Sequence, residues 1–426
     1  MQASLFNMAA TLIRIGGAPV SAWLMAHHLT QSQQGYYYTF ASLLSVQYVL
    51  EMGIGPRLVQ FLSHEWALLS QPDSEAAAGR FHALVALTRR YYLYAGLTLV
   101  SCLFVMGYLS FAAKGADWAW PWTILLVAVG FRFLWLQRAV VLEGTGNMRQ
   151  VYQIRAGEAT LMTLTSWAAL LSDRGLWVQP CIFIVASVYT GTALKVAYGR
   201  LRKSFPAPPP APQEFPWRLE LWPLYWRQAL GMAVGVFCSM FPLILFNTRG
   251  PGEAGQFGLT WALASALVVA LPDAYMSSFW SPYGARVAQQ DYSALYKLHR
   301  RCRFRALSIG LTGSLAILAL LCLAPTYIPK ISQRLLPPSV TIVLLLGMLL
   351  QQASAIEIQF VRSFKVEPFL AWSLLCSGLI GVCSWTLSPR YGSMAIAVTY
   401  LLVHLVVALP VTHYMAHQQR QRQDRC

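Results

Sequence analysis

Residues 119–143 read AWPWTILLVAVGFRFLWLQRAVVLE, a stretch whose only charged residues are Arg132, Arg138 and the terminal Glu143. A helix of this length rises about 37 Å, whereas about 20 apolar residues already cross the hydrocarbon core of a bilayer. Similar stretches recur along the chain, which is 56% hydrophobic and 11% charged, against about 25% charged residues in soluble domains. The composition excludes an ordinary soluble fold and predicts an all-α polytopic membrane protein.

Reading outward from this stretch predicts twelve membrane spans in the 426 residues. They lie at residues 5–27, 36–62, 91–113, 119–143, 157–173, 178–198, 228–247, 257–281, 306–324, 338–358, 367–387 and 393–415. The span at 157–173 has the weakest pattern because it is short and rich in threonine and serine. Without this span, the alternation of the later gaps between the two sides of the membrane would reverse.

A proline-rich stretch at 204–213 divides the chain into two sets of six predicted spans. The predicted division is an N-terminal lobe at 1–200, a cytoplasmic linker at 201–226, a C-terminal lobe at 227–417 and a basic tail at 418–426. The halves also echo each other. Gly35-Tyr36-Tyr37 corresponds to Gly255-Gln256-Phe257, 220 residues later. Because each half has an even number of spans, the pattern predicts a parallel repeat with its cargo site between the lobes.

Lysine and arginine fall mainly in alternate gaps between the predicted spans, 24 on one side and six on the other. The smaller set is Lys114, Arg174, Arg249, Lys330, Arg334 and Arg390. Short cytoplasmic loops carry an excess of these residues. Both termini are therefore predicted to be cytoplasmic, and the net charge of +16 has a topological meaning.

Sequence signals for an enzyme are weak. The chain has no Gly-x-x-x-x-Gly-Lys-Ser/Thr motif, and Gly144-Thr145-Gly146 is typical of a turn. The predicted outer gaps are short, the longest at about 325–337. Its eight cysteines form no Cys-x-x-Cys pair, which gives no support to a zinc site or a disulfide framework. We expect a transporter with no cofactor, no metal and no nucleic-acid partner.

Charges inside the predicted spans are the strongest functional signal. Arg14 lies about nine residues into the first span, a depth of about 13 Å, and Arg132 lies similarly deep in the fourth. Burying such an arginine costs about 2.5–3.5 kcal/mol on insertion scales, so each side chain needs a polar partner. A guanidinium fork suits phosphate oxygens, which predicts an anion site at Arg14 and Arg132, with Arg138 as a weaker candidate.

The alternative is that each arginine pairs with a nearby acid and only holds helices together. Glu51, Glu143 and Glu158 are candidate partners for this packing role. Glu51, Asp273 and Glu357 are also candidates for ion coupling or charge pairing, since acids inside spans often serve one of these purposes.

Helix breakers predict places where the spans bend. Gly16, Gly17 and Pro19 follow Arg14, and Gly53, Gly55 and Pro56 fall within the second span. These six residues are candidate hinges for alternating access, although membrane helices tolerate glycine and proline without any such role.

Two stretches carry a family resemblance: Gly35-Tyr36-Tyr37-Tyr38-Thr39-Phe40-Ala41-Ser42 and Glu51-Met52-Gly53-Ile54-Gly55. With twelve spans in two halves and short outer loops, they resemble the polysaccharide transporters, the O-antigen and exopolysaccharide repeat-unit flippases of the multidrug, oligosaccharidyl-lipid and polysaccharide (MOP) exporter superfamily. The resemblance implies a MATE-like, V-shaped pair of lobes. It also implies movement of undecaprenyl-diphosphate-linked oligosaccharide across a bacterial inner membrane, with polysaccharide polymerase machinery as a further partner.

Relatives in this superfamily often carry basic residues in the first spans, and Arg14 matches them by its position in span one. For Arg132, its depth in the membrane is what supports a role in binding the diphosphate. One rival is an ion-coupled drug or small-molecule exporter of the same superfamily. Those usually carry an acid in the first span, whereas this sequence has none before Glu51. Another rival, a membrane glycan polymerase or glycosyltransferase, is disfavoured by the short outer loops.

Overall fold

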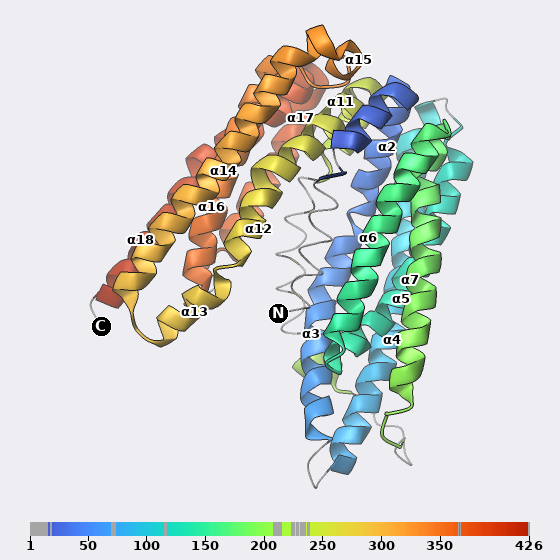
Figure 1. Cartoon of the computed structure of the whole chain (residues 1–426), viewed down its shortest axis with the longest axis vertical. Coiled ribbons are helices and arrows are strands. Elements are labelled where there is room, and N and C mark those ends of the chain that lie inside the picture. The colour runs from blue at the N-terminus through green and yellow to red at the C-terminus, as the bar shows by residue number, and fades with distance from the viewer. Residues whose placement is uncertain are drawn as a thin grey trace. The chain divides into compact units, whose positions relative to one another are not determined.

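The computed structural model describes residues 16, 17, 19–69, 74–114, 117–207, 215–222, 226, 230, 236, 239–364, 366 and 368–424. Throughout these residues the regular structure is helical, without a strand (Figure 1), which confirms the all-α prediction. The chain separates into two compact units. Unit 1 holds residues 1–17 and 40–236, and unit 2 holds residues 18–39 and 237–426.

Seven helical segments of the described chain are long and apolar enough to cross a membrane. They are Glu75–Lys114, Ala119–Gly144, Gly175–Arg202, Pro251–Ser277, Tyr292–Tyr327, Pro338–Arg362 and Leu370–Gln423. The last covers the predicted span 393–415 and all but the first three residues of the predicted span 367–387. Four predicted spans, at 5–27, 36–62, 157–173 and 228–247, have no counterpart among the seven, so the total of twelve stays a prediction.

Unit 1 is a bundle of helices that pack through their apolar faces. Its main helices are α3 (Gln47–Leu68), α4 (Ser74–Phe111), α5 (Ala119–Gly144), α6 (Met148–Leu171) and α7 (Val178–Arg202). Helix α5 packs on α3, α4 and α7, and α6 packs on α7. Short 3₁₀ turns, η1 (Ala112–Lys114) and η2 (Gly175–Trp177), and the one-turn α8 (Trp217–Glu220) complete the described part of the unit.

The interruption in the second predicted span lies at residues 45 and 46, between α2 (Gln31–Leu44) and α3. Ser45 Oγ donates to the Ser42 carbonyl at 2.6 Å, and the amides of Val46 and Val49 bond carbonyls three residues back. These tight bonds replace the regular helical ladder. The candidate hinge residues Gly53, Gly55 and Pro56 lie inside the continuous helix α3 instead.

Unit 2 contains the remaining helices, beginning with a helical segment at residues 19–28. Its elements in the second half are α10 (Phe241–Thr248), α11 (Pro251–Ala264), η3 (Ser265–Ala270), α12 (Leu271–Ser277), α13 (Trp280–Ala288), α14 (Tyr292–Tyr327), α15 (Pro329–Ser332), α16 (Pro338–Arg362), α17 (Leu370–Val403), η4 (His404–Ala408) and α18 (Leu409–Asp424). Helix α16 is central because it packs on α14, α17 and α18, as Figure 1 shows.

The two π-helical segments, η3 and η4, each end directly before a Leu-Pro pair. Leu271-Pro272 follows η3, and Leu409-Pro410 follows η4. Proline has no amide hydrogen and its ring crowds the preceding turn. A widened turn relieves this conflict without ending the helix. Pro272 therefore reshapes its helix rather than terminating it.

Helix α17 joins two predicted spans through a kink at Gly392, whose φ is 58° and lies outside the helical region. The Glu253 carboxylate accepts the amide of Ser393 at 2.6 Å. A Cβ at residue 392 would overlap that carboxylate. The kink thus combines a backbone conformation that favours glycine with a side-chain cap from α11.

Residues 18–39 pack within unit 2, whereas the sequence-based division placed them in the N-terminal lobe. The reason is local packing around Gly35 and Gly255, the two glycines that the predicted repeat pairs. Gln34 Nε2 donates to the Gly255 carbonyl at 2.8 Å, and a Cβ on Gly255 would lie 2.9 Å from the Gly35 amide nitrogen. Sequence spacing related these glycines, but only folding could bring them into contact.

Candidate functional site

Arg132, near the middle of α5, forms an ion pair with Glu158 of α6. Its Nε–H donates to Glu158 Oε1 at 2.6 Å, and the two side chains are 18% and 6% exposed. Glu158 is one of the three acids that the sequence named as partners. The terminal amino groups of the guanidinium make no hydrogen bond to the described residues. Among the described residues, Arg132 is therefore paired through Nε and has further donors without a partner.

Other charges surround this pair and define the unit-1 charge group: Glu51, Arg132, Glu143, Arg155 and Glu158. Arg155 Nη2 lies 2.6 Å from Glu143 Oε1. Glu51 of α3 interacts electrostatically with Arg132, Arg155 and Glu158. Three helices, α3, α5 and α6, contribute these residues, and α7 packs on α5 and α6. The sequence nominated four of these residues, and Arg155 was counted only as a topological charge.

Arg138 follows Arg132 by six residues, about 240° further around the helix, so the two guanidiniums leave α5 on different sides. The Arg138 guanidinium carbon lies 4.3 Å from the ring centroid of Trp135 and 5.8 Å from that of Tyr198. Such stacking compensates part of the desolvation of a cation. The structure does not join Arg138 to the unit-1 charge group.

Glu357 of α16 is fully buried and faces three basic side chains of unit 2. Arg303 Nη1 lies 2.7 Å from Glu357 Oε1, and His299 Nε2 and Arg420 Nη2 lie 3.4 and 3.5 Å from Oε2. We call these four residues the Glu357 cluster. It joins α14, α16 and α18. The sequence singled out Glu357 but not its partners, which come from segments more than 50 residues away.

Asp273 of α12 has a neutral partner. Gln352 Nε2 of α16 donates to Asp273 Oδ1 at 3.0 Å. A single amide bond leaves the carboxylate without a counter-charge among the described residues. Asp273 therefore stays a candidate for ion coupling, because its described partner is neutral. Glu357 faces basic side chains instead, as expected of a charge-pairing residue.

The first candidate hinge coincides with the division of the chain, because unit 1 includes residue 17 and unit 2 begins at residue 18. Gly16, Gly17 and Pro19 are helical. Gly17 is buried, and an added Cβ would lie 3.1 Å from Thr163 Cγ2. Arg14 lies outside the described residues, so its role stays a prediction.

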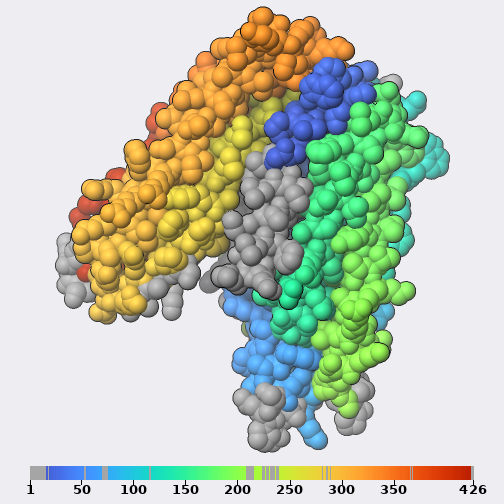
Figure 2. All heavy atoms as spheres, in the orientation of Figure 1, coloured from blue at the N-terminus to red at the C-terminus, as the bar shows by residue number. Residues whose placement is uncertain are grey.

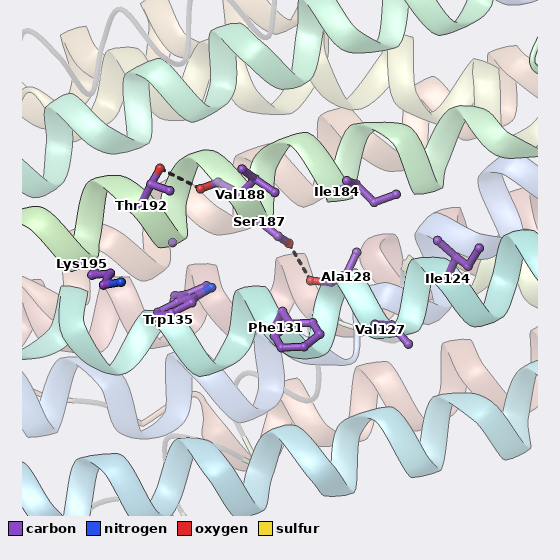
Figure 3. A pocket seen from close by; sticks show the side chains of 11 residues that line it. Ile124, Val127, Ala128, Phe131, Trp135, Ile184, Ser187, Val188, Thr192 and Lys195 are labelled. Atoms are coloured by element: carbon purple, nitrogen blue, oxygen red, sulfur yellow. Dashed lines mark hydrogen bonds between the residues drawn. The ribbon is translucent and has the colours of Figure 1, made fainter.

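An apolar groove of about 550 Å³ runs along α5 and α7 of unit 1. Figure 3 shows Ile124 and Val127 towards one end and Trp135 and Lys195 at the other. The two hydroxyls of its lining are both satisfied: Ser187 Oγ donates to the Ala128 carbonyl at 2.6 Å, and Thr192 Oγ1 donates to the Val188 carbonyl at 2.8 Å. Gly191 makes room for the Trp135 indole, whose Nε1 would lie 2.6 Å from an added Cβ. The groove can accommodate a hydrocarbon chain.

Comparison with family models and with characterised protein sequences finds no match. Solved structures do match. The lipid II flippase MurJ in an inward closed conformation has a TM-score of 0.64 and 13% identity, covering 96% of this chain and 87% of that one.

Two MATE structures match along nearly their full length. One is an outward-facing multidrug resistance MATE family transporter of the MOP superfamily, with a TM-score of 0.55 and 14% identity, covering 100% of this chain and 97% of that one. The other is MATE in a bent conformation, with a TM-score of 0.51 and 15% identity, covering 99% and 95%. The chain therefore has the fold that MurJ and the MATE transporters of the MOP superfamily share.

Proposed function

We propose that this protein is a MOP-type flippase that moves undecaprenyl-diphosphate-linked oligosaccharide repeat units across a bacterial inner membrane by alternating access. O-antigen or exopolysaccharide synthesis would supply these units, and polysaccharide polymerase machinery would receive them. The proposal treats the protein as a transporter and not an enzyme. Both termini would be cytoplasmic.

The observation that carries the proposal is the state of Arg132. Its guanidinium lies in a membrane helix and keeps its terminal amino groups unbonded within the described residues, while Nε is held by Glu158. Such a pre-oriented fork suits a phosphate oxygen, because charge-assisted hydrogen bonds are stronger than neutral ones. Glu158 fixes the guanidinium so that binding loses less side-chain freedom. Arg14, by its predicted depth, would supply the second cation for a diphosphate.

The lipid part of the substrate also needs an apolar path. The groove between α5 and α7 has walls of apolar side chains such as Ile124, Phe131 and Val188. Val188 is 62% exposed, and Phe131 is 56% exposed. In a membrane these side chains face lipid, so a polyprenyl chain could lie against them while its headgroup remains near polar groups.

A second candidate, an ion-coupled small-molecule or drug exporter, is supported by the similarity to MATE transporters and by Asp273, an acid without a counter-charge in the described structure. The sequence weighs against it because no acid precedes Glu51. Arg14, at its predicted depth, would also repel a cationic drug, whereas Arg132 is paired with Glu158.

Depletion of this protein from its host, followed by lipid extraction, tests the proposal. Lipid-linked oligosaccharide should accumulate on the cytoplasmic leaflet, and wild-type protein should reverse this. Arg14→Ala should fail to complement although it inserts into the membrane. Arg390→Ala, an exposed arginine outside the predicted spans, serves as the matched control and should complement.

Other results would redirect the assignment. Unchanged lipid-linked glycan together with raised drug retention would favour the exporter. Unpolymerised units on the outer leaflet would favour a polymerase or ligase. Loss of folded protein in Arg14→Ala would show a packing role for that arginine.

A further inference from the structure

One end of unit 2 contains a second pocket, of about 360 Å³, distinct from the apolar groove. It forms where residues 26–30 meet α15 and the residues that follow it. Figure 2 shows these two surfaces in contact, α15 in orange and the chain leading into α2 in blue. The lining includes His27, His28, Leu29, Lys330, Gln333 and Arg334. We call it the basic pocket.

Hydrogen bonds between the two segments hold the basic pocket in shape. Arg334 Nη2 donates to the Leu29 carbonyl at 2.5 Å. In the other direction, Gln31 Nε2 donates to the Gln333 carbonyl at 3.3 Å, and Gln34 Nε2 to the Arg334 carbonyl at 3.3 Å. These bonds tie positions 300 residues apart, so the pocket is a product of the tertiary fold.

The lining contains four basic side chains, His27, His28, Lys330 and Arg334, and no acidic one. Lys330 and Arg334 are two of the six lysines and arginines that the sequence places on the outer side. Their meeting in one pocket concentrates positive charge on the side that is otherwise poor in it. A cavity with this lining favours anions.

Arg334 has an unsatisfied buried donor: its Nη1 is buried and has no hydrogen-bond partner in the described chain. Burial lowers the pKa of the Arg334 guanidinium, because a cation removed from water has lost hydration that no acid replaces. Buried donors in native proteins almost always have a partner. A ligand oxygen would complete this one.

The start of α2 adds to the same field. Thr30 caps the helix reciprocally: its amide donates to Gln33 Oε1 at 2.9 Å, and the Gln33 amide donates to Thr30 Oγ1 at 3.2 Å. The positive end of the helix dipole thereby lies at the pocket, where it stabilises a nearby anion.

We propose that the basic pocket binds a phosphate-type oxyanion carrying more than one negative charge, such as pyrophosphate or the phosphate of a lipid headgroup. Two cations, Lys330 and Arg334, in a lining without an acid suit a multivalent anion better than a monovalent one, and the Arg334 guanidinium supplies a planar donor matched to phosphate oxygens. The inference rests on unit 2 alone. It holds whether the transported substrate is a glycolipid or a small molecule.

Calorimetric titration of the purified full chain with pyrophosphate, in chloride buffer, tests this site. Arg334→Gln should weaken the affinity at least about tenfold, and Lys330→Gln by about three- to fivefold, because each removes one cation from the ligand. Arg390→Gln removes the same charge from an exposed position of the same unit outside the pocket and should bind as the wild type does. A thermal melt of each variant separates loss of the site from loss of the fold.

A second arm identifies the source of the phosphate. The protein is placed in phosphatidylcholine nanodiscs with or without polyprenyl phosphate, and lipid retention is measured for wild type and Lys330→Gln. Retention that depends on Lys330, without binding of free pyrophosphate, assigns the pocket to a lipid headgroup. Equal binding by all variants, or no binding in either arm, would overturn the proposal.

Discussion

Two regions of unit 2 differ in whether their charged side chains have partners of opposite charge. In the Glu357 cluster, one fully buried carboxylate is surrounded by His299, Arg303 and Arg420. In the basic pocket, His27, His28, Lys330 and Arg334 meet without an acid. The first arrangement satisfies its own charges, whereas the second leaves a cation whose buried Nη1 has no partner in the described residues.

The difference separates charges that hold the fold together from charges that await a ligand. The Glu357 cluster fastens α14, α16 and α18 and lies in an apolar core that includes Tyr283, Leu295 and Phe360. A binding pocket has to stay incomplete until its ligand arrives. Arg132 lies between these extremes, since Glu158 takes one of its donors and leaves others.

Breaking the Glu357 cluster should have the largest effect on stability. Glu357→Ala should lower the free energy of unfolding by about 3–5 kcal/mol, because it removes the fully buried acid that joins α14, α16 and α18 and leaves the buried His299 and the partly exposed Arg303 and Arg420 without it. Thermal unfolding of the purified protein measures the loss. Glu220→Ala is the control, since its partner Arg80 is 39% exposed and exposed pairs contribute about 0–1 kcal/mol. Equal shifts for both variants would contradict the structural role assigned to the cluster.

A double substitution tests whether the Arg132–Glu158 pair serves packing or binding. Arg132→Met and Glu158→Leu should each cost about 3 kcal/mol alone, because each leaves the other charge unpaired. Together they should restore most of the stability, since an apolar pair of similar volume replaces the ion pair. The double variant should nevertheless fail to move lipid-linked glycan if Arg132 contacts the diphosphate. A stable and fully active double variant would assign Arg132 to packing alone.

A smaller effect is expected where a charge acts on the backbone. Gly392→Ala should destabilise the protein by about 1–2 kcal/mol or more, because φ at this residue is 58° and left-handed conformations disfavour side chains. The new methyl group would also displace the Glu253 carboxylate from the Ser393 amide. Gly378→Ala, in the same helix with open space around it, should leave the melting temperature unchanged or raised.

A substitution in the basic pocket should cause the smallest change in stability and a clear change in the response to ligand. Arg334→Gln removes the bond to the Leu29 carbonyl, but it also removes an uncompensated buried charge, so we expect a net change within about 1 kcal/mol. Excess pyrophosphate should raise the melting temperature of the wild type. At a ligand concentration about one hundred times Kd, binding adds about 2.7 kcal/mol to the free energy of unfolding. The same addition should stabilise Arg334→Gln by about 1.4 kcal/mol at most, because a tenfold weaker Kd leaves only a tenfold excess of ligand. A variant that responds as strongly as the wild type would place the anion elsewhere.

Local pattern was sufficient to predict helices such as 119–143, which the structure places at Ala119–Gly144. Local pattern was less reliable where helices continue across predicted boundaries. Helices α4 and α14 begin at Ser74 and Tyr292, well before the predicted spans at 91 and 306. Hydropathy reports where apolar residues begin, whereas backbone hydrogen bonding continues through the polar turns that precede them.

The sequence by itself determined that this is an all-helical membrane protein and that Arg132, Glu158 and Glu357 carry charge inside it, since hydropathy and cost of burial are properties of the residues. Only the tertiary structure decided the partners: Arg132 with Glu158, Glu357 with Arg303 and Arg420, and Arg334 beside Leu29. Contacts between segments 26 to 305 residues apart depend on helix packing, which no local pattern encodes. The basic pocket was invisible for the same reason.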